Sequence, residues 1–280
     1  MAINLSLIGT DIGEITHTYN WKDVVIYALG VGAKVNELDF LYEGEGPKVL
    51  PTFAVVPAFK ALALTAARLK TDLLMVVHGE QTIKLHRPIP PKGTLITTGK
   101  VANIYDKGSG ALVILETTTH DKEGGPPIFD NTFSIFVRGQ GGFGGDRGPK
   151  TPASAIPAGE KPTWEFTERT SNEQHLLFRL NGDTNPIHVS PKIAKMAGFE
   201  RPILHGLCTY GHAGRAVLHN ACGGDPSKLR SFGARFTGNV LPGDTLTTRG
   251  WKVAPNKHLI RVETQNGTTV IDNCVAEVDA

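Results

Sequence analysis

Three polar side chains stand close together in the stretch NGDTNPIH, residues 181–188: the carboxylate of Asp183, the carboxamide of Asn185 and the imidazole of His188. A carboxylic acid with a pKa of about 4 and an imidazole with a pKa of about 6.5 can hold a water molecule between them and share its protons. An Asp-capped turn beside a surface histidine is the alternative interpretation, because turns favour Asn, Gly, Asp and Pro. Such a turn gives the histidine no role.

The residues around this stretch predict a kinked turn in front of a short helix. Gly182 allows another group to approach the backbone closely, and the proline after Asn185 favours an extended backbone at Asn185. A helix is expected to begin after Ser190, a typical N-cap residue followed by proline, and to end before Gly198. The carboxylate and the imidazole therefore flank a turn whose side chains can converge on one point.

A second stretch, RPILHGLCTYGH (201–212), predicts the start of a longer helix from about Gly206 to Ala221. The first N–H groups of a helix have no internal partner, so an anionic oxygen could accept a hydrogen bond from Gly206, which has no side chain. Ordinary helix initiation is the alternative. Cys208 lies in the apolar stripe and is expected to be a core thiol. The histidines of this helix have no carboxylate at ligand spacing, so no metal site is predicted.

The chain also carries an internal duplication. GTLITTGKV begins at position 93 and DTLTTRGWKV at position 244, an offset of 151, and the prolines of LPTFA and RPILHG keep the same offset. Two copies of one structural unit are the economical interpretation. Each copy predicts a long helix, at about 55–70 and 206–221, followed by four or more strands, which gives an α+β fold with one sheet wrapped over each helix. Pairing the copies edge to edge would extend the sheet and protect its edges.

The duplication repeats the scaffold but does not repeat the candidate catalytic residues. At the offset of 151, Asp183 aligns with Gly32 and His188 aligns with Glu37. The scaffold is therefore repeated, whereas the Asp and the His occur once. A residue pair that only shaped a turn would suit either copy equally well, so this difference favours a catalytic site in the second copy.

A segment rich in Gly and Pro separates the two copies. It predicts an N-terminal repeat at 1–145, a linker at 146–162 and a catalytic C-terminal repeat at 163–280. Glycines within 139–144 satisfy the pattern GxGxxG, but more Gly and Pro follow instead of the helix that a dinucleotide site requires. No nucleotide-binding loop is predicted.

Composition excludes several classes of function. Lys and Arg number 29 and Asp and Glu 27, and a net charge of +2 gives no electrostatic case for binding nucleic acid. No apolar run reaches about 18 residues, so no membrane span is predicted, and no secretory signal is recognised. Three scattered cysteines predict reduced thiols. The C-terminal EVDA differs from a peroxisomal SKL-type signal, so a cytoplasmic protein is expected.

The stretch FRLNGDTNPIHVSPKIA (178–194), followed by RPILHGLCTYG (201–211), resembles the hydratase 2 motif of the MaoC-like (R)-specific 2-enoyl-CoA hydratases. The resemblance spans the whole chain, including HGEQ, DKGSG and RGQGGFGG, and extends to the hydratase unit of peroxisomal multifunctional enzyme type 2. Asn181 is a departure, because a small residue is usual there, and it bears on the pocket wall more than on the chemistry.

The resemblance implies a double hot-dog fold, a homodimer of such chains and a tunnel for long acyl groups. It implies reversible hydration of trans-2-enoyl-CoA to (3R)-3-hydroxyacyl-CoA, without a metal or a separate cofactor, because CoA is part of the substrate. The implied catalytic residues are Asp183, His188 and Gly206. Asn185, His78, Gly79, Lys107 and Phe236 are expected to contact the substrate or orient the catalytic pair, and Arg235 is expected to pair, like Lys107, with CoA phosphates.

Several alternatives stay open. A hot-dog acyl-CoA thioesterase and an acyl-CoA binding module without turnover are the alternative functions. Lys107 also suits a plain hairpin turn. The sequence does not decide which member of the Asp183–His188 pair acts as the base, because a pair that shares protons titrates as a unit. A peroxisomal location is the alternative if the chain is part of a larger multifunctional enzyme.

Overall fold

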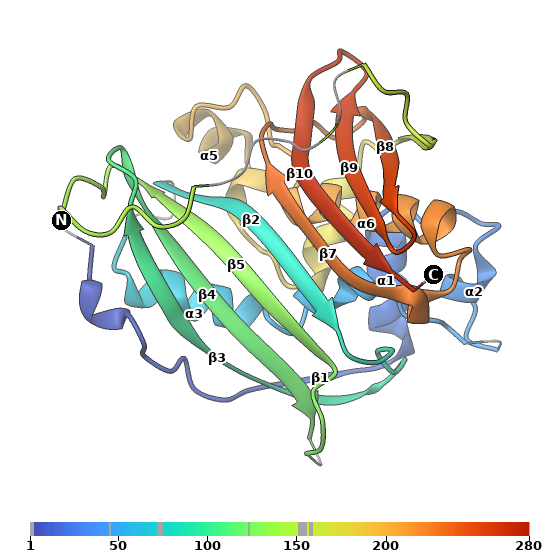
Figure 1. The fold of residues 1–280 in the computed structure, drawn as a ribbon, viewed down its shortest axis with the longest axis horizontal. Coiled ribbons are helices and arrows are strands. Elements are labelled where there is room, and N and C mark those ends of the chain that lie inside the picture. The colour runs from blue at the N-terminus through green and yellow to red at the C-terminus, as the bar shows by residue number, and fades with distance from the viewer. Residues whose placement is uncertain are drawn as a thin grey trace.

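A single antiparallel sheet of ten strands forms the body of the protein in the computed structural model, which describes residues 3–44, 46–71, 75–122, 124–150, 156 and 159–279. The strand order is β1-β3-β4-β5-β2-β7-β10-β9-β8-β6. Figure 1 shows the sheet curving over helices, with α3 behind the strands of the first half and α6 behind those of the second. The predicted α+β arrangement is confirmed.

Each half of the sheet comes from one half of the chain. The strands of the first half are β1 (Ile15–Tyr19), β2 (Val76–Leu85), β3 (Gly93–Asp106), β4 (Gly110–Asp121) and β5 (Phe129–Arg138). The strands of the second half are β6 (Trp164–Arg169), β7 (Leu229–Phe236), β8 (Thr245–Ala254), β9 (Lys257–Thr264) and β10 (Thr269–Val278). β1 and β6, which lie at the two ends of the sheet, were not predicted from the sequence.

The two halves join where β2 pairs with β7. This antiparallel pairing runs from Glu80 opposite Arg235 to Lys84 opposite Ser231. It removes one exposed edge from each half, as the edge-to-edge prediction requires. The junction also brings the start of β2 beside the end of β7, which is where several predicted site residues lie.

The helices differ between the halves. In the second half, α6 (Gly206–Ala221) is a continuous helix of 16 residues with the predicted bounds. In the first half, the helix expected at 55–70 is shorter: α3 spans Phe59–Arg68, and a separate 3-10 segment (Pro51–Val55) precedes it. The remaining helices are α1 (Trp21–Gly30), α2 (Leu38–Leu41), α4 (Gln174–Phe178) and α5 (Pro191–Met196), with 3-10 segments at Leu5–Leu7, Arg179–Asn181, Pro186–His188 and Pro226–Lys228.

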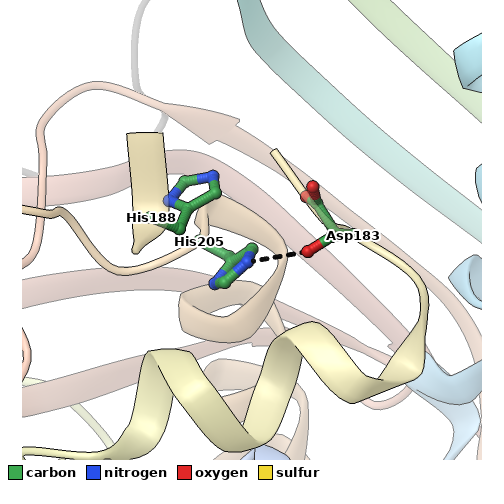
Figure 2. A group of neighbouring side chains, drawn as sticks. All are labelled: Asp183, His188 and His205. Atoms are coloured by element: carbon green, nitrogen blue, oxygen red, sulfur yellow. Dashed lines mark hydrogen bonds between the residues drawn. The ribbon is translucent and has the colours of Figure 1, made fainter. Parts of the chain in front are cut away.

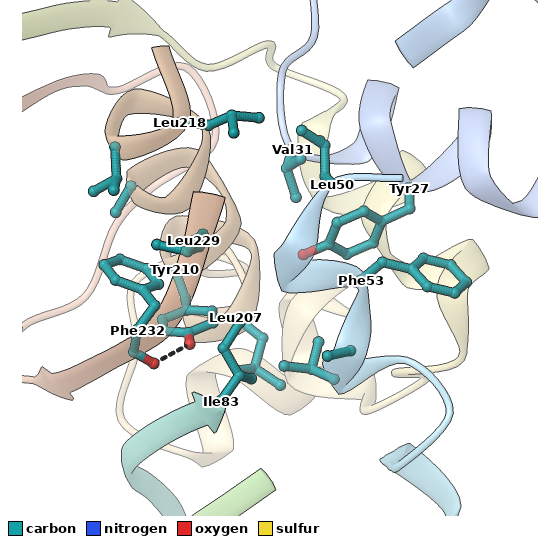
Figure 3. Close-up of a cluster of buried hydrophobic side chains, with 14 of the residues drawn as sticks. Tyr27, Val31, Leu50, Phe53, Ile83, Leu207, Tyr210, Leu218, Leu229 and Phe232 are labelled. Atoms are coloured by element: carbon teal, nitrogen blue, oxygen red, sulfur yellow. Dashed lines mark hydrogen bonds between the residues drawn. The ribbon is translucent and has the colours of Figure 1, made fainter. Parts of the chain in front are cut away.

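The main hydrophobic core surrounds α6 and includes residues from both halves of the chain, as Figure 3 shows. Tyr210 of α6 stacks on Phe232 of β7, with the ring centroids 4.7 Å apart, and its hydroxyl donates a 2.6 Å hydrogen bond to the Phe232 carbonyl. On the other side, Tyr27 and Phe53 meet edge to face at 5.5 Å. Burying each such side chain stabilises the fold by about 1.5–3 kcal/mol. The core therefore holds the two repeats together as one body.

The glycine-rich segment wraps around a carboxylate. Asp106 accepts hydrogen bonds of 2.8 Å from the N–H groups of Gly108, Gly142 and Gly144. These contacts lower the pKa of Asp106, because they favour the charged form. The backbone of the GxGxxG stretch thus binds an anion that the chain itself supplies. Residues 151–155 and 157–158 of the predicted linker lie outside the described residues.

No helix within the described part of the chain is long and apolar enough to cross a membrane.

Candidate active site

The turn that carries Asp183 is fixed by glycine and by local hydrogen bonds. Gly182 has a φ of +117°, and a Cβ there would lie 3.3 Å from the Phe59 ring, so the turn requires glycine for its conformation and its close approach. Asp183 Oδ1 accepts from the Asn185 N–H at 3.2 Å, and Asn185 Oδ1 accepts from the Ile187 N–H at 3.2 Å. Asn185 therefore stabilises the turn that positions Asp183.

The helix after the turn begins and ends as predicted. Ser190 is the N-cap of α5, and its hydroxyl accepts from the Ile193 N–H at 3.3 Å. Beyond the C-terminus of α5, Gly198 has a φ of +88°. The turn that carries Asp183 is thus followed directly by a helix with defined ends.

Asp183, His188 and His205 converge, as Figure 2 shows. One carboxylate oxygen of Asp183 and one ring nitrogen of each histidine lie within 4.8 Å of one another. A water molecule that makes two hydrogen bonds of about 2.8 Å at a tetrahedral angle spans about 4.6 Å. The separation therefore suits a single bridging water.

His188 is held in one tautomer. Its Nδ1 lies 2.9 Å from the carbonyl oxygen of Ile203, and because a carbonyl only accepts, Nδ1 carries the proton. Nε2 is left with a free lone pair. Burial lowers the pKa of His188, and the nearby Asp183 carboxylate opposes this shift. The residue is 7% exposed, so burial favours the neutral form of the ring, in which Nε2 can act as a base.

His205, which the sequence analysis did not select, completes the cluster. Its ring is fully buried and stacks on His188 with centroids 3.7 Å apart. Its Nε2 donates to the backbone carbonyl of Asp183 at 3.2 Å. Burial lowers the pKa of His205 to about 2, so its ring is neutral. The offset of 151 is the signal that could have found it, because it aligns His205 with Ala54.

The same three residues form the group of Asp, Glu, His and Cys side chains that could hold a metal ion among the described residues. The two rings are stacked with only 26° between their planes, so their lone pairs run in nearly parallel planes. Tetrahedral zinc requires lone pairs that converge on one point at about 2.0–2.1 Å. This arrangement suits a hydrogen-bonded water better than a metal.

Gly206 lies at the tip of α6. The first hydrogen bonds of this helix run from the N–H groups of Cys208 and Thr209 to the His205 carbonyl, which leaves the Gly206 N–H outside the helical pattern. The Phe236 ring lies 3.5 Å from the place that a Cβ on Gly206 would occupy. The Gly206 N–H therefore stands at the positive end of a 16-residue helix, beside the Phe236 ring.

His78, Gly79 and Phe236 lie near this helix tip. His78 meets Phe236 edge to face at 5.1 Å, and its Nε2 lies 3.0 Å from the Glu80 carbonyl. Burial lowers the pKa of His78 to about 4, so its ring is neutral. Gly79 falls where the register of β2 against β5 shifts. The structure thus brings this part of the predicted binding set together with Gly206.

Lys107 and Arg235 have other partners. The Lys107 ammonium donates to the Arg147 carbonyl and lies 5.6 Å from the Tyr105 ring centroid, as a hairpin lysine would. Arg235 precedes Phe236 in β7, so its side chain points to the opposite sheet face, where it lies 4.0 Å from Glu80. No hydrogen bond or ion pair within the described chain joins either one to the Asp183 cluster.

Two further residues support the sequence interpretation. Cys208 is fully buried, its Sγ donates to the Gly30 carbonyl at 3.2 Å, and burial raises its pKa well above the usual value, as expected of a core thiol. Asn181, the departure from the motif, donates to the Phe178 carbonyl at 2.9 Å. Its Nδ2 lies 3.1 Å from the Cβ position of Gly30, so it packs against the first repeat.

The corresponding place in the first repeat is filled by a buried ion network. A Cβ on Gly32, which aligns with Asp183, would lie 2.3 Å from the His212 ring. Glu37, which aligns with His188, accepts from Arg215 at 3.0 Å and pairs with His219 at 2.6 Å. Arg215 also binds Glu168 at 2.8 Å. Side chains of the second repeat therefore occupy the space that a second Asp–His pair would need.

Comparisons with known proteins identify the family of the chain. The family described as MFE-2 hydratase 2 N-terminal domain matches residues 17–139, and the family described as MaoC like domain matches residues 154–273. "Probable enoyl-CoA hydratase 2" of Dictyostelium discoideum is 41% identical, covering 98% of this chain and 95% of that protein.

Solved structures show the same fold. A MaoC-like dehydratase from Phytophthora capsici has a TM-score of 0.88 at 32% identity and covers 99% of this chain and 98% of its own. A Mycobacterium tuberculosis protein described as having a double hot-dog fold has a TM-score of 0.63 at 16% identity, covering 97% of this chain and 96% of that one. The predicted double hot-dog fold is confirmed, and the chain belongs to the MaoC-like hydratase 2 family.

Proposed function

We propose that the protein catalyses the reversible addition of water to trans-2-enoyl-CoA, which gives (3R)-3-hydroxyacyl-CoA. The observation that carries this proposal is a carboxylate and a neutral imidazole at water-bridging distance, beside the helix tip that presents the Gly206 N–H. Hydratases among the relatives support the reaction class, since the Dictyostelium protein is named an enoyl-CoA hydratase 2.

Charge develops on the thioester during the reaction. The oxygen of water attacks C3, the C2–C3 double bond shifts towards C1, and the thioester oxygen gains negative charge. The Gly206 N–H donates a hydrogen bond to that oxygen, and one such donor contributes roughly a hundred- to a thousandfold to the rate. The positive end of α6 adds to the same stabilisation.

Asp183 and His188 hold the attacking water and move its protons. The free Nε2 of His188 accepts one hydrogen bond from the water, and the Asp183 carboxylate accepts the other. One proton of the water passes to this pair, and the pair returns one proton to C2. The reaction therefore needs no net proton and no cofactor, and the pair contributes about 10²–10⁴-fold.

Substrate binding completes the proposal. His78, Gly79 and Phe236 border the approach to Gly206, and Asn185 orients the turn that carries Asp183. Pairing of Lys107 and Arg235 with CoA phosphates, the acyl tunnel, the homodimer and the cytoplasmic location stay predictions. Exchange of Lys107 or Arg235 for Ala, followed by a measurement of KM for enoyl-CoA, tests their part.

Incubation with crotonyl-CoA tests the proposal. We expect loss of the enone absorbance without release of free thiol, and a product that is the (3R) enantiomer. Release of thiol would instead indicate a thioesterase, and binding of C4 to C16 enoyl-CoAs without turnover would indicate a binding module. Either result, or a (3S) product, would overturn the proposed reaction.

A further inference from the structure

The side chain of His205 touches each part of the candidate site. His205 is the N-cap residue of α6 and directly precedes Gly206. Its Nε2–H donates to the backbone carbonyl of Asp183 at 3.2 Å, so it fixes the main chain that carries the carboxylate. Its ring stacks on His188 at 3.7 Å. The turn that carries Asp183, the His188 imidazole and the helix tip therefore all adjoin one residue.

The surroundings of His205 restrain it on the remaining side. Phe178 of α4 packs against the ring, with the centroids 5.0 Å apart. The side chain is fully buried, so it cannot turn to solvent. A planar ring between Phe178 and His188 sets the distance of His188 from the rest of the fold, because interiors are close-packed and transmit small changes in volume.

The first repeat shows that packing at this position does not require a histidine. His205 aligns with Ala54, which is also fully buried, and the Ala54 carbonyl accepts from Asn131 at 3.0 Å. The same scaffold position is thus filled by a methyl group in the repeat that lacks the Asp and the His. The histidine accompanies the catalytic pair rather than the fold.

Proton transfer by His205 itself does not fit its contacts. Its Nε2–H is already donated to the Asp183 carbonyl, and burial keeps the ring neutral. The remaining nitrogen, Nδ1, is buried and has no hydrogen-bond partner among the described residues. His205 is therefore better suited to act by positioning Asp183 and His188 than by transferring a proton itself.

We propose that His205 is a positioning residue for the hydration reaction. It sets the separation between the Asp183 carboxylate and the His188 imidazole, and it holds both at the helix tip formed by Gly206. This inference rests on the proposed function. A misplacement of about 1 Å in a catalytic group can cost about 10²-fold in rate, so the effect of losing this contact is measurable.

Three substitutions of His205 and one control test the proposal. His205→Phe keeps a planar ring for stacking but has no donor for the Asp183 carbonyl. His205→Gln keeps an N–H donor at similar reach, and His205→Asn carries the same amide on a shorter side chain. His258→Phe is the matched control, since His258 is 4% exposed and lies in β9 beside Trp164, outside the site.

Hydration of crotonyl-CoA is measured for each variant, together with KM and the thermal midpoint. We expect kcat to fall about 10- to 100-fold in His205→Phe and His205→Asn, with KM changed less than about twofold. The kcat of His205→Gln is expected to be at least about tenfold higher than that of His205→Asn. His258→Phe is expected to keep the wild-type kcat.

Other results would overturn the inference. A His205→Phe enzyme with the kcat of the control, or a His205→Gln enzyme no faster than His205→Asn, contradicts positioning through the hydrogen bond. If His205→Phe does not fold, the comparison of Gln with Asn decides alone. Failure of the wild-type protein to hydrate crotonyl-CoA would instead reject the proposed function, so the two failures are distinguishable.

Discussion

The two repeats use the same scaffold position for opposite purposes. In the second repeat the loop after α4 brings Asp183 and His188 together, with a carboxylate oxygen and a ring nitrogen within 4.8 Å of each other. In the first repeat the corresponding loop presents Glu37 to Arg215, whose guanidinium is 1% exposed. The loop of the second repeat therefore carries the proposed catalytic residues, whereas the loop of the first repeat is held by a buried ion network that joins the repeats. The duplication gave two equivalent loops, and only one of them has to stay free of stabilising contacts for the proposed reaction.

The long helices of the two repeats also differ, and again the second repeat has the features of the proposed site. α6 is continuous, and its tip delivers the Gly206 N–H, whereas the helix of the first repeat is broken into a 3-10 segment and α3. The break follows from Pro57, which lies between the 3-10 segment and α3, since proline disrupts helix interiors. A broken helix has no long aligned dipole at the corresponding point, so the first repeat lacks the electrostatic element as well as the catalytic pair.

The largest expected effect is on the catalytic pair. His188→Ala and Asp183→Asn each remove one contact to the bridging water, so we expect hydration to fall at least about 10²–10⁴-fold while the fold and CoA affinity persist. Steady-state kinetics and calorimetric binding of CoA check this. The Lys34→Ala substitution, in the corresponding loop of the first repeat, is the control and is expected to leave kcat unchanged. Unimpaired turnover in either catalytic variant would remove the distinction between the repeats.

The ion network of the first repeat is expected to affect stability instead. Arg215→Met leaves the largely buried carboxylates of Glu37 and Glu168 without their main partner. Breaking a buried ion pair from one side costs about 3–5 kcal/mol. Urea unfolding is expected to show this loss, while kcat per folded molecule changes little. A stable Arg215→Met protein would show that the network does not hold the repeats together.

A smaller stability effect is expected at the glycine that replaces Asp183 in the first repeat. Gly32→Ala places a Cβ 2.3 Å from the His212 ring at a φ of +84°, so the substitution is both crowded and strained. Overpacking of this kind costs about 1–3 kcal/mol. Thermal unfolding measures the cost, and Gly9→Ala serves as a control because its φ is +78° with open space around it. Equal losses in the two variants would show that crowding by His212 contributes nothing.

The last effect concerns pH. Burial lowers the pKa of His188 and lowers that of His205 to about 2, so the folded state binds fewer protons than the unfolded state, in which both pKa values are about 6.5. Stability therefore rises with pH in this range, is complete above about pH 6.5, and is lost as the pH falls towards 2. The acid limb of the kcat profile is expected below pH 6.5. An acid limb at or above that value would show that His188 is not desolvated.

Much of the fold was predictable because it depends on local patterns. α6 and the eight inner strands follow from periodicity, and the Ser190 cap follows from side-chain chemistry. β6, by contrast, is a short strand at the sheet end whose every second residue is exposed. α1 carries a capping box between Asn20 and Asp23, a local signal from which the start of this helix is predictable.

The proximity of Asp183 and His188 was predictable because the two residues lie five positions apart and occur in one repeat. His205 was not, since its role depends on a stack between segments 17 positions apart. The network of Arg215 with Glu37 was also beyond local reasoning, because its partners are separated by 178 positions. Contacts of that kind follow from the packing of the repeats, and no pattern within one repeat contains them.

The most direct test is an experimental density map of the space between Asp183 and His188. We predict one water molecule at about 2.6–3.2 Å from both the Asp183 carboxylate and Nε2 of His188. A metal ion bound at about 2.0–2.2 Å, or side chains turned away from each other with no room for a water, would contradict the central claim.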